Sequence, residues 1–233
     1  MPKISWPPPL GQQPAISSLA AAADTARLNN PPTASNRLAL TLQELATLRR
    51  QFIVIRQPPV YTDPEFARAR AFVVLSHAAI EDYLEGIALE VVDKCIQAFN
   101  SDGKARTSLL ALLGYGSMSD VPSSFSGGPW GMRTLLRDSR KALRAWTEAN
   151  NGVKAKDVLR LLLPVGVKET DMGSLWLQHM DDLGELRGRV AHHGNPPGAQ
   201  APVDPLDTLD HVARVLPTLC RLDARMCALR DES

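Results

Sequence analysis

The sequence predicts an all-α fold, an antiparallel bundle of four or five long helices with short accessory helices packed on it. Apolar residues recur at steps of three and four through several long segments, and the alternating pattern of strands is absent. These segments end at proline and glycine clusters, which stop helices. The chain has 233 residues, of which 44% are apolar, so it can bury one sizeable core.

The domain organisation follows from a change in composition near the N-terminus. Residues 1–33 are rich in proline and alanine and are predicted to form an arm with one short helix over 16–28. Residues 34–233 are predicted to form the helical domain. The first helix of this domain starts after Ser35, whose side chain suits an N-cap, and runs to about Arg56, where two prolines follow.

The longest predicted helix begins at Asp63 and Pro64, with a capping carboxylate and a proline in the first turn. It runs to about Phe99 and is stopped by Gly103. Five apolar side chains and one histidine recur on a single face of this helix, which predicts that the face is buried in the core. The face consists of Val73, His77, Ile80, Leu84, Ile87 and Val91.

Five more helices are predicted from the spacing of apolar residues. They span about 105–113, 132–149, 155–163, 172–193 and 205–230. A loop rich in glycine and serine, over 114–131, separates the first two of them. The glycines and prolines of 194–198 stop the helix that ends at about residue 193.

Charge and cysteine content exclude several classes of function. The chain has 26 Lys and Arg against 25 Asp and Glu, so it is not a strongly basic protein that coats nucleic acid. Its three cysteines lack the spacing of a disulfide framework or a zinc site, and Cys220 and Cys227 are predicted to lie reduced on one buried stripe. Without a membrane-spanning run or a signal-peptide core, a cytoplasmic protein that does not contact the membrane is predicted.

The most specific chemical pattern lies at the end of the helix predicted over 172–193. The sequence there reads ELRGRVAHHG, with four residues between Arg187 and His192, and a glycine-proline loop follows at once. Upstream, residues 75–85 of the long helix read LSHAAIEDYLE. Together these segments resemble the HEPN superfamily, whose members carry an Arg-x(4–6)-His motif at the end of a late helix and a long early helix. The resemblance spans roughly residues 65–230.

This resemblance implies a metal-independent endoribonuclease that acts as a homodimer, with the motifs of two protomers facing one cleft. Arg187 and His192 are the implied catalytic residues, and no cofactor or metal is implied. The 2′-OH of the RNA substrate would be the nucleophile, so the product would carry a 2′,3′-cyclic phosphate. The resemblance further implies a toxin or a defence effector, controlled by an antitoxin or a sensor protein.

The residue types fit this chemistry. A histidine with a pKa near neutrality can accept the proton of the 2′-OH or donate one to the leaving 5′-oxygen, and an arginine can hold the scissile phosphate. His193 also satisfies the motif spacing and is a secondary candidate, while the alternative is that both histidines cap the helix end. Because five positions advance about 140° around a regular helix, His192 is expected on an unwound last turn.

Other polar residues have both a functional and a structural interpretation. Arg189 is a candidate for phosphate contact, or it pairs with Glu185 one helical turn earlier. Glu81 is a secondary candidate, because the resemblance allows an acidic residue of the early helix near the cleft, and the alternative is a polar edge of a buried helix. His179, Asp182 and Glu185 share one helix, but no second cluster completes a metal site, so no metal is predicted.

Basic residues recur at steps of three and four along the helix predicted over 132–149. They either follow an RNA backbone or form a solvated helix face. This basic stripe consists of Arg133, Arg137, Arg140, Lys141 and Arg144.

A second function stays open, namely a non-catalytic HEPN-like helical module that binds nucleotide, RNA or a protein partner. Gly188 favours it, because it follows Arg187 at a position where active HEPN proteins often carry Asn or another polar residue. The net charge of +1 favours it as well. The intact spacing of Arg187 and His192 at a glycine-terminated helix end favours the nuclease.

Overall fold

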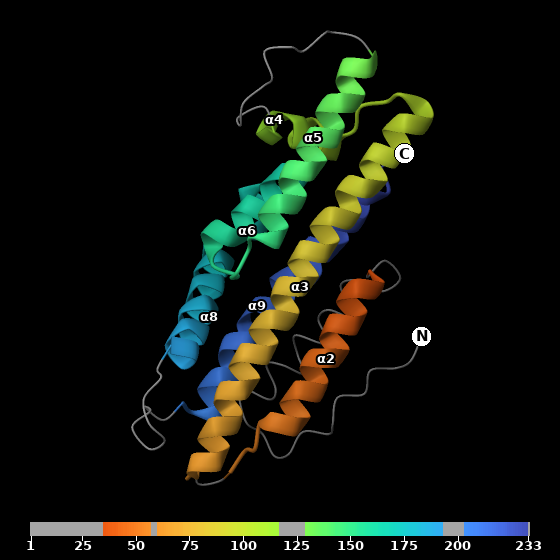
Figure 1. The fold of residues 1–233 in the computed structure, drawn as a ribbon. Helices are drawn as coiled ribbons and strands as arrows, with labels where there is room; N and C mark the ends of the chain where they lie inside the picture. The colour runs from red at the N-terminus through yellow and green to blue at the C-terminus, as the bar shows by residue number, and fades with distance from the viewer. Residues whose placement is uncertain (1–34, 57–59, 117–128, 193–202, 233) are drawn as a thin grey trace.

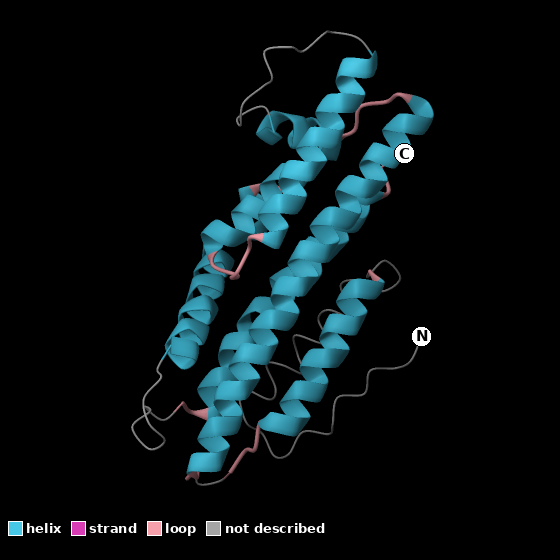
Figure 2. Cartoon of the chain, in the orientation of Figure 1, coloured by secondary structure: helices cyan, strands magenta, loops and turns pink. Residues whose placement is uncertain are grey.

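The computed structural model describes residues 35–56, 60–116, 129–192 and 203–232. Within these ranges every regular element is helical and no strand occurs, which confirms the all-α prediction (Figures 1 and 2). The predicted arm with its helix over 16–28 lies outside the described residues. The same holds for most of the loop predicted over 114–131 and for the stop at 194–198.

Long helices form most of the described part of the chain (Figure 1). They are α2 (Asn36–Phe52), α3 (Asp63–Asp102), α5 (Pro129–Glu148), α8 (Ser174–His192) and α9 (Pro205–Arg230). The shorter elements are α4 (Thr107–Gly116), α6 (Ala155–Leu162), the 3₁₀ helix η1 (Leu163–Val165) and α7 (Glu169–Met172). Every helix predicted after residue 34 is present. The short elements η1 and α7 were not predicted, because three or four residues are too few to show a helical period.

The start of α3 differs from the prediction in its capping residue. The N-cap is Thr62 rather than Asp63, and Pro64 lies in the first turn. The carboxylate of Glu65 accepts hydrogen bonds of 2.8 Å from both the backbone N–H and the hydroxyl of Thr62, an arrangement that stabilises a helix N-terminus. At the other end, Gly103 adopts a left-handed conformation with φ of 73° and terminates α3, as predicted.

The first helix of the bundle, α2, is capped as predicted but is shorter. The Ser35 hydroxyl accepts a hydrogen bond of 3.0 Å from the backbone N–H of Leu38. The backbone becomes extended at Ile53, whose side chain is buried, so α2 ends at Phe52 instead of about Arg56.

The arrangement of the helices is centred on α3, which packs against α2, α8 and α9. Figure 1 shows α2, α5 and α8 running antiparallel to α3, as predicted for an antiparallel bundle. In contrast, α9 runs parallel to α3, since Tyr83 pairs with Asp223 and Glu90 with Arg230 further along both helices. The parallel orientation arises because α8 returns the chain to the end of the bundle where α3 begins (Figure 1).

The core lies where α3 faces these three helices. All six residues of the predicted buried face of α3 are at most 2% exposed, including His77. Cys220 and Cys227 are buried on α9, as predicted, and neither forms a disulfide. Burial raises the pKa of Cys220 to about 12 and that of Cys227 to about 11, so both thiols are neutral at physiological pH.

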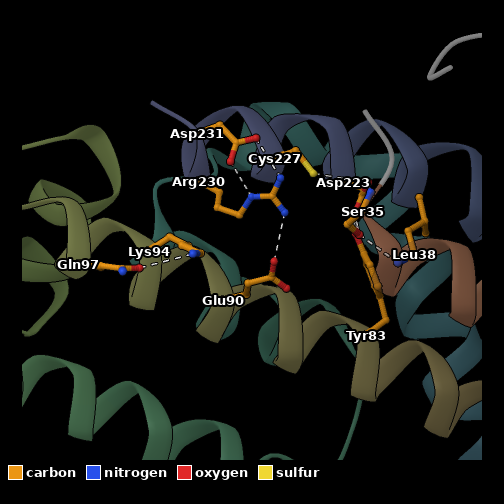
Figure 3. Close-up of polar contacts among 10 residues, drawn as sticks. All are labelled: Ser35, Leu38, Tyr83, Glu90, Lys94, Gln97, Asp223, Cys227, Arg230 and Asp231. Atoms are coloured by element: carbon orange, nitrogen blue, oxygen red, sulfur yellow. Dashed lines mark hydrogen bonds and ion pairs between the residues drawn. The ribbon is translucent and has the colours of Figure 1, made fainter. Parts of the chain in front are cut away.

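A fully buried aspartate, Asp223 of α9, joins three helices (Figure 3). Its carboxylate accepts hydrogen bonds from the backbone N–H of Ser35 at 2.8 Å, the Ser35 hydroxyl at 2.5 Å and the Tyr83 hydroxyl at 2.9 Å. Burial, with Asp223 beside it, holds the pKa of Tyr83 well above its ordinary value, so this hydroxyl stays a donor. The N-cap of α2 is therefore fixed to α9 and α3 through one carboxylate.

Candidate functional site

The motif arginine lies on the part of α8 that packs along α3. Arg187 is half-buried there. The helix α8 stays α-helical through His192, so the unwound last turn expected before this residue is not formed. The side chain of His192 and the whole of His193 lie outside the described residues. The roles of the two histidines therefore stay predictions, and the site can be described around Arg187.

Arg187 lies near His77 and Glu81 of α3. Its positive charge acts to lower the pKa of both side chains. The two α3 residues are one helical turn apart, with 3.6 Å between Nδ1 of His77 and Oε2 of Glu81, too long for a strong hydrogen bond. The structure thus brings Arg187 and Glu81, both predicted as site residues, into one polar cluster.

Asn150, in the connection between α5 and α6, completes this cluster. Its Nδ2 atom donates toward Oε1 of Glu85 at 2.8 Å, Oε1 of Glu81 at 3.2 Å and the carbonyl oxygen of Gly152 at 3.0 Å. The sequence analysis missed this residue, since an asparagine just after a helix end usually signals only a turn. We call His77, Glu81, Glu85, Asn150 and Arg187 the Arg187 cluster.

Electrostatics determines which members of the Arg187 cluster carry charge. Burial, with a smaller contribution from Arg187, lowers the pKa of His77 to about 4, so its imidazole is neutral at pH 7. Burial and the charge of Glu85 raise the pKa of Glu81, while Arg187 opposes that rise. Burial also raises the pKa of Glu85, and the Asn150 hydrogen bond opposes it. Glu81 is the carboxyl group of the cluster whose pKa Arg187 acts to lower, and the guanidinium has N–H donors that can bind an anion.

Protonation of His77 is expected to destabilise the fold as the pH falls. Its pKa of about 4 lies below the ordinary 6.5, so the unfolded state binds the proton first. The stability that the neutral imidazole contributes is complete above pH 6.5 and is lost as the pH falls from 6.5 toward 4. From these values, the free energy of unfolding should fall by about 2 kcal/mol between pH 7 and pH 5 through His77 alone, as measured by urea denaturation.

The His77→Gln variant isolates this effect, because glutamine is polar but does not titrate. Its free energy of unfolding should lose about 2 kcal/mol less than that of the wild type over the same pH interval. The raised pKa values of Glu81 and Glu85 act in the opposite direction in both proteins and cancel in the comparison. Equal pH dependence of the two proteins would contradict a neutral, buried His77.

The other predicted residues of α8 do not form a metal site. The Nδ1 atom of His179 lies 3.9 Å from a carboxylate oxygen of Asp182, while Glu185 lies 3.9 Å from the ammonium of Lys154. Among the described residues, no three His, Cys, Asp or Glu side chains are grouped so that they could hold a metal ion. Arg189 is exposed on the same helix.

The predicted basic stripe lies on α5, with side chains that are exposed or half-buried. Arg140 binds the Asp93 carboxylate of α3 through two hydrogen bonds, of 2.5 and 2.8 Å. Arg144 lies 3.7 Å from Glu148, the next turn of α5. Exposed ion pairs within one helix, such as Arg144 with Glu148, contribute little stability. Arg144 can therefore bind another anion.

No protein-family model, curated protein or solved structure matches the chain. In the ranges that the structure describes, no helix is long and apolar enough to cross a membrane. The Arg187 cluster and the basic stripe of α5 are the two features of the described chain that bear on its function.

Proposed function

We propose that this chain is a metal-independent endoribonuclease of the HEPN type, with Arg187 and His192 as its catalytic residues. The observation that supports this most strongly is the position of Arg187 on α8. It lies close enough to His77 and Glu81 of α3 for its charge to act on the pKa of both, and Asn150 of the α5–α6 connection binds Glu81.

The proposed reaction follows from the chemistry of the two residues. His192 accepts the proton from a ribose 2′-OH, whose oxygen attacks the adjacent phosphorus, or it donates a proton to the leaving 5′-oxygen. The P–O5′ bond breaks and a 2′,3′-cyclic phosphate forms. Arg187 stabilises the charge on the phosphate oxygens as it develops, and Glu81 orients the guanidinium.

Helix geometry favours a site shared between two copies of the chain. In a continuous α-helix, positions 187 and 192 are about 140° apart around the axis, so they do not share one face. A homodimer in which two α8 helices face one cleft supplies both residue types to the same phosphate. A role as a toxin or defence effector in the cytoplasm, held in check by an antitoxin or sensor, is part of this proposal.

The test is cleavage of mixed cellular RNA by the purified protein in excess EDTA. Fragments that end in 2′,3′-cyclic phosphate are expected. Cleavage that stops when EDTA is added would contradict metal independence, and a dimeric protein that leaves RNA intact would contradict the nuclease.

The second candidate is a non-catalytic module that binds nucleotide, RNA or a partner protein, and Gly188 favours it. This position lacks the polar side chain that often follows the motif arginine in active HEPN proteins. A Cβ atom added at Gly188 would meet nothing within 4 Å, so the structure has room for that side chain.

A Gly188→Asn variant is expected to cleave RNA about tenfold faster than the wild type, because one hydrogen bond to a charged group is worth at least 1.4 kcal/mol. It should also be more stable by roughly 0.3–0.5 kcal/mol, since glycine is the poorer helix former. Gly188→Ala is the control, because it adds the Cβ atom without the amide. Equal rates for the Asn and Ala variants would show that the polar group is not needed.

A further inference from the structure

The groove between α3 and α5 is a second surface feature, and its lining indicates what kind of ligand it can bind. This α3–α5 groove has a cavity volume of about 540 Å³, within the range of ligand-binding clefts. Its α5 wall presents Arg133, Arg137 and Arg140 at successive turns, and its α3 wall presents Asp93. Three guanidinium groups against one carboxylate give the groove a net positive charge.

The arginines of the groove differ in the ion pairs that their side chains form. Arg140 is held by Asp93 in a two-bond pair that joins the two helices. Arg137 is 72% exposed and pairs only with its neighbour Asp138, at 3.1 Å, among the interactions that the structure describes. Such an exposed pair contributes little stability, so a phosphate can replace it. Arg133 is exposed one turn earlier on the same wall.

The floor and the α3 wall show what else the ligand would meet. Leu136 and Ile96 form the floor and belong to a small apolar cluster with Cys95 and Leu109, which gives the groove a packed base. Gln97 lies on the α3 wall, and its side-chain oxygen accepts a hydrogen bond from Lys94 at 3.4 Å, which Figure 3 shows. None of the described residues that line the groove is aromatic. Of these residues, the arginines are the ones that can hold a nucleic acid, and they do so by its phosphates.

The groove and the Arg187 cluster are both bounded by α3 and by α5 or the connection that follows it. From the groove, α5 runs antiparallel to α3 and leads to Asn150, which binds Glu81 and Glu85. Asp93 follows Glu81 on α3 by 12 residues, a rise of about 18 Å at 1.5 Å per residue. The exposed Lys141 and Arg144 lie on the α5 segment between the two sites.

We propose that the α3–α5 groove binds the phosphate backbone of the single-stranded RNA that the Arg187 cluster acts on, through Arg133 and Arg137. This inference rests on the proposed function. It adds that the substrate is a single strand long enough to reach both sites. Binding of phosphates by guanidinium groups is salt-dependent and has little base preference.

The test measures binding without cleavage. The probe is a fluorescent single strand of 2′-O-methyl RNA of about 12 nucleotides, which lacks the 2′-OH and cannot be cleaved, titrated at several salt concentrations. The test variant carries Arg133→Gln and Arg137→Gln. The matched control carries Arg50→Gln and Arg68→Gln, which remove the same charge from exposed positions on α2 and at the start of α3. Because the probe is inert, the result does not depend on whether the protein is a nuclease.

The test variant lacks two phosphate contacts, so its slope of log affinity against log salt should be smaller than that of the wild type by about 1.4. Between 50 and 200 mM salt, the affinity of the wild type should therefore fall by a factor about sevenfold larger than that of the test variant. The control variant should keep the wild-type slope. Equal slopes for both variants, or a test variant that binds like the wild type, would overturn the proposal. Adenosine monophosphate that binds with the same dependence on Arg133 and Arg137 would show a free-nucleotide site and would overturn the strand assignment.

Discussion

The Arg187→Ala variant is expected to lose RNA cleavage by about 10²- to 10³-fold, the usual effect of removing one donor that stabilises transition-state charge. The guanidinium supplies the positive charge of the Arg187 cluster, so it is the member that can bind the phosphate by charge. His77 of the same cluster is neutral at pH 7 and adds no positive charge. The measurement is the rate at which a defined RNA is cleaved in EDTA, with cyclic-phosphate ends as the product signature.

The matched controls come from the same segment. Arg189, the secondary candidate for phosphate contact, is exposed two positions away, so Arg189→Ala should keep most of the activity. A loss as large as that of Arg187→Ala would place Arg189 in the site. Arg187→Lys keeps the charge but loses the paired donors, so its rate should lie between those of the wild type and Arg187→Ala. His192→Ala should match Arg187→Ala, while His193→Ala should not. The opposite result for the histidines would move the catalytic role to His193.

The position of Arg187 near His77 of α3 can be tested without measuring activity. Because Arg187 lowers the pKa of His77, the Arg187→Ala variant should show a higher pKa of His77 in an NMR titration. This shift tests the neighbourhood of Arg187 and does not require activity. An unchanged pKa of His77 would remove the argument that Arg187 faces α3, whereas a shifted pKa without any cleavage would favour the non-catalytic module.

Local signals in the sequence were enough to predict the helices. The six-residue face of α3 repeats at helical spacing and is buried, and Ser35 caps α2 as its position before an apolar run indicates. The wrong prediction of Asp63 as the N-cap of α3 also has a local cause. Two adjacent residues, Thr62 and Asp63, are both good caps, and only the geometry of Glu65 selects Thr62.

Contacts between distant segments could not be predicted in the same way. Arg187 and Glu81 were both singled out, but Asn150, which binds Glu81, gave no signal, because no periodic pattern links a turn residue to a helix far earlier in the chain. The parallel orientation of α9 could not be predicted for the same reason. It depends on how the intervening helices return the chain, and Asp223 resembles any other polar residue of a helix until its partners are known.

Loss of the Asp223 carboxylate is expected to destabilise the bundle strongly. In Asp223→Ala, the backbone N–H and hydroxyl of Ser35 and the hydroxyl of Tyr83 lose their buried acceptor. Since an unsatisfied buried donor costs about 1–3 kcal/mol, we expect the free energy of unfolding to fall by about 3–4 kcal/mol in urea denaturation. The change also removes the link between the N-cap of α2 and α9, so amide exchange in the first turn of α2 should accelerate most.

Two variants separate the hydrogen-bond network from other effects of the mutation. Tyr83→Phe removes one donor but leaves the pairing of Asp223 with Ser35, so it should cost only about 1 kcal/mol. Asp210→Ala removes an aspartate of the same helix that pairs with Arg214 on the surface, and it should cost less than about 1 kcal/mol. If Asp223→Ala were no more destabilising than Asp210→Ala, the carboxylate would not hold α2 to the core. Docking of α2 would then depend on the buried side chains of Leu38 and Leu45 instead.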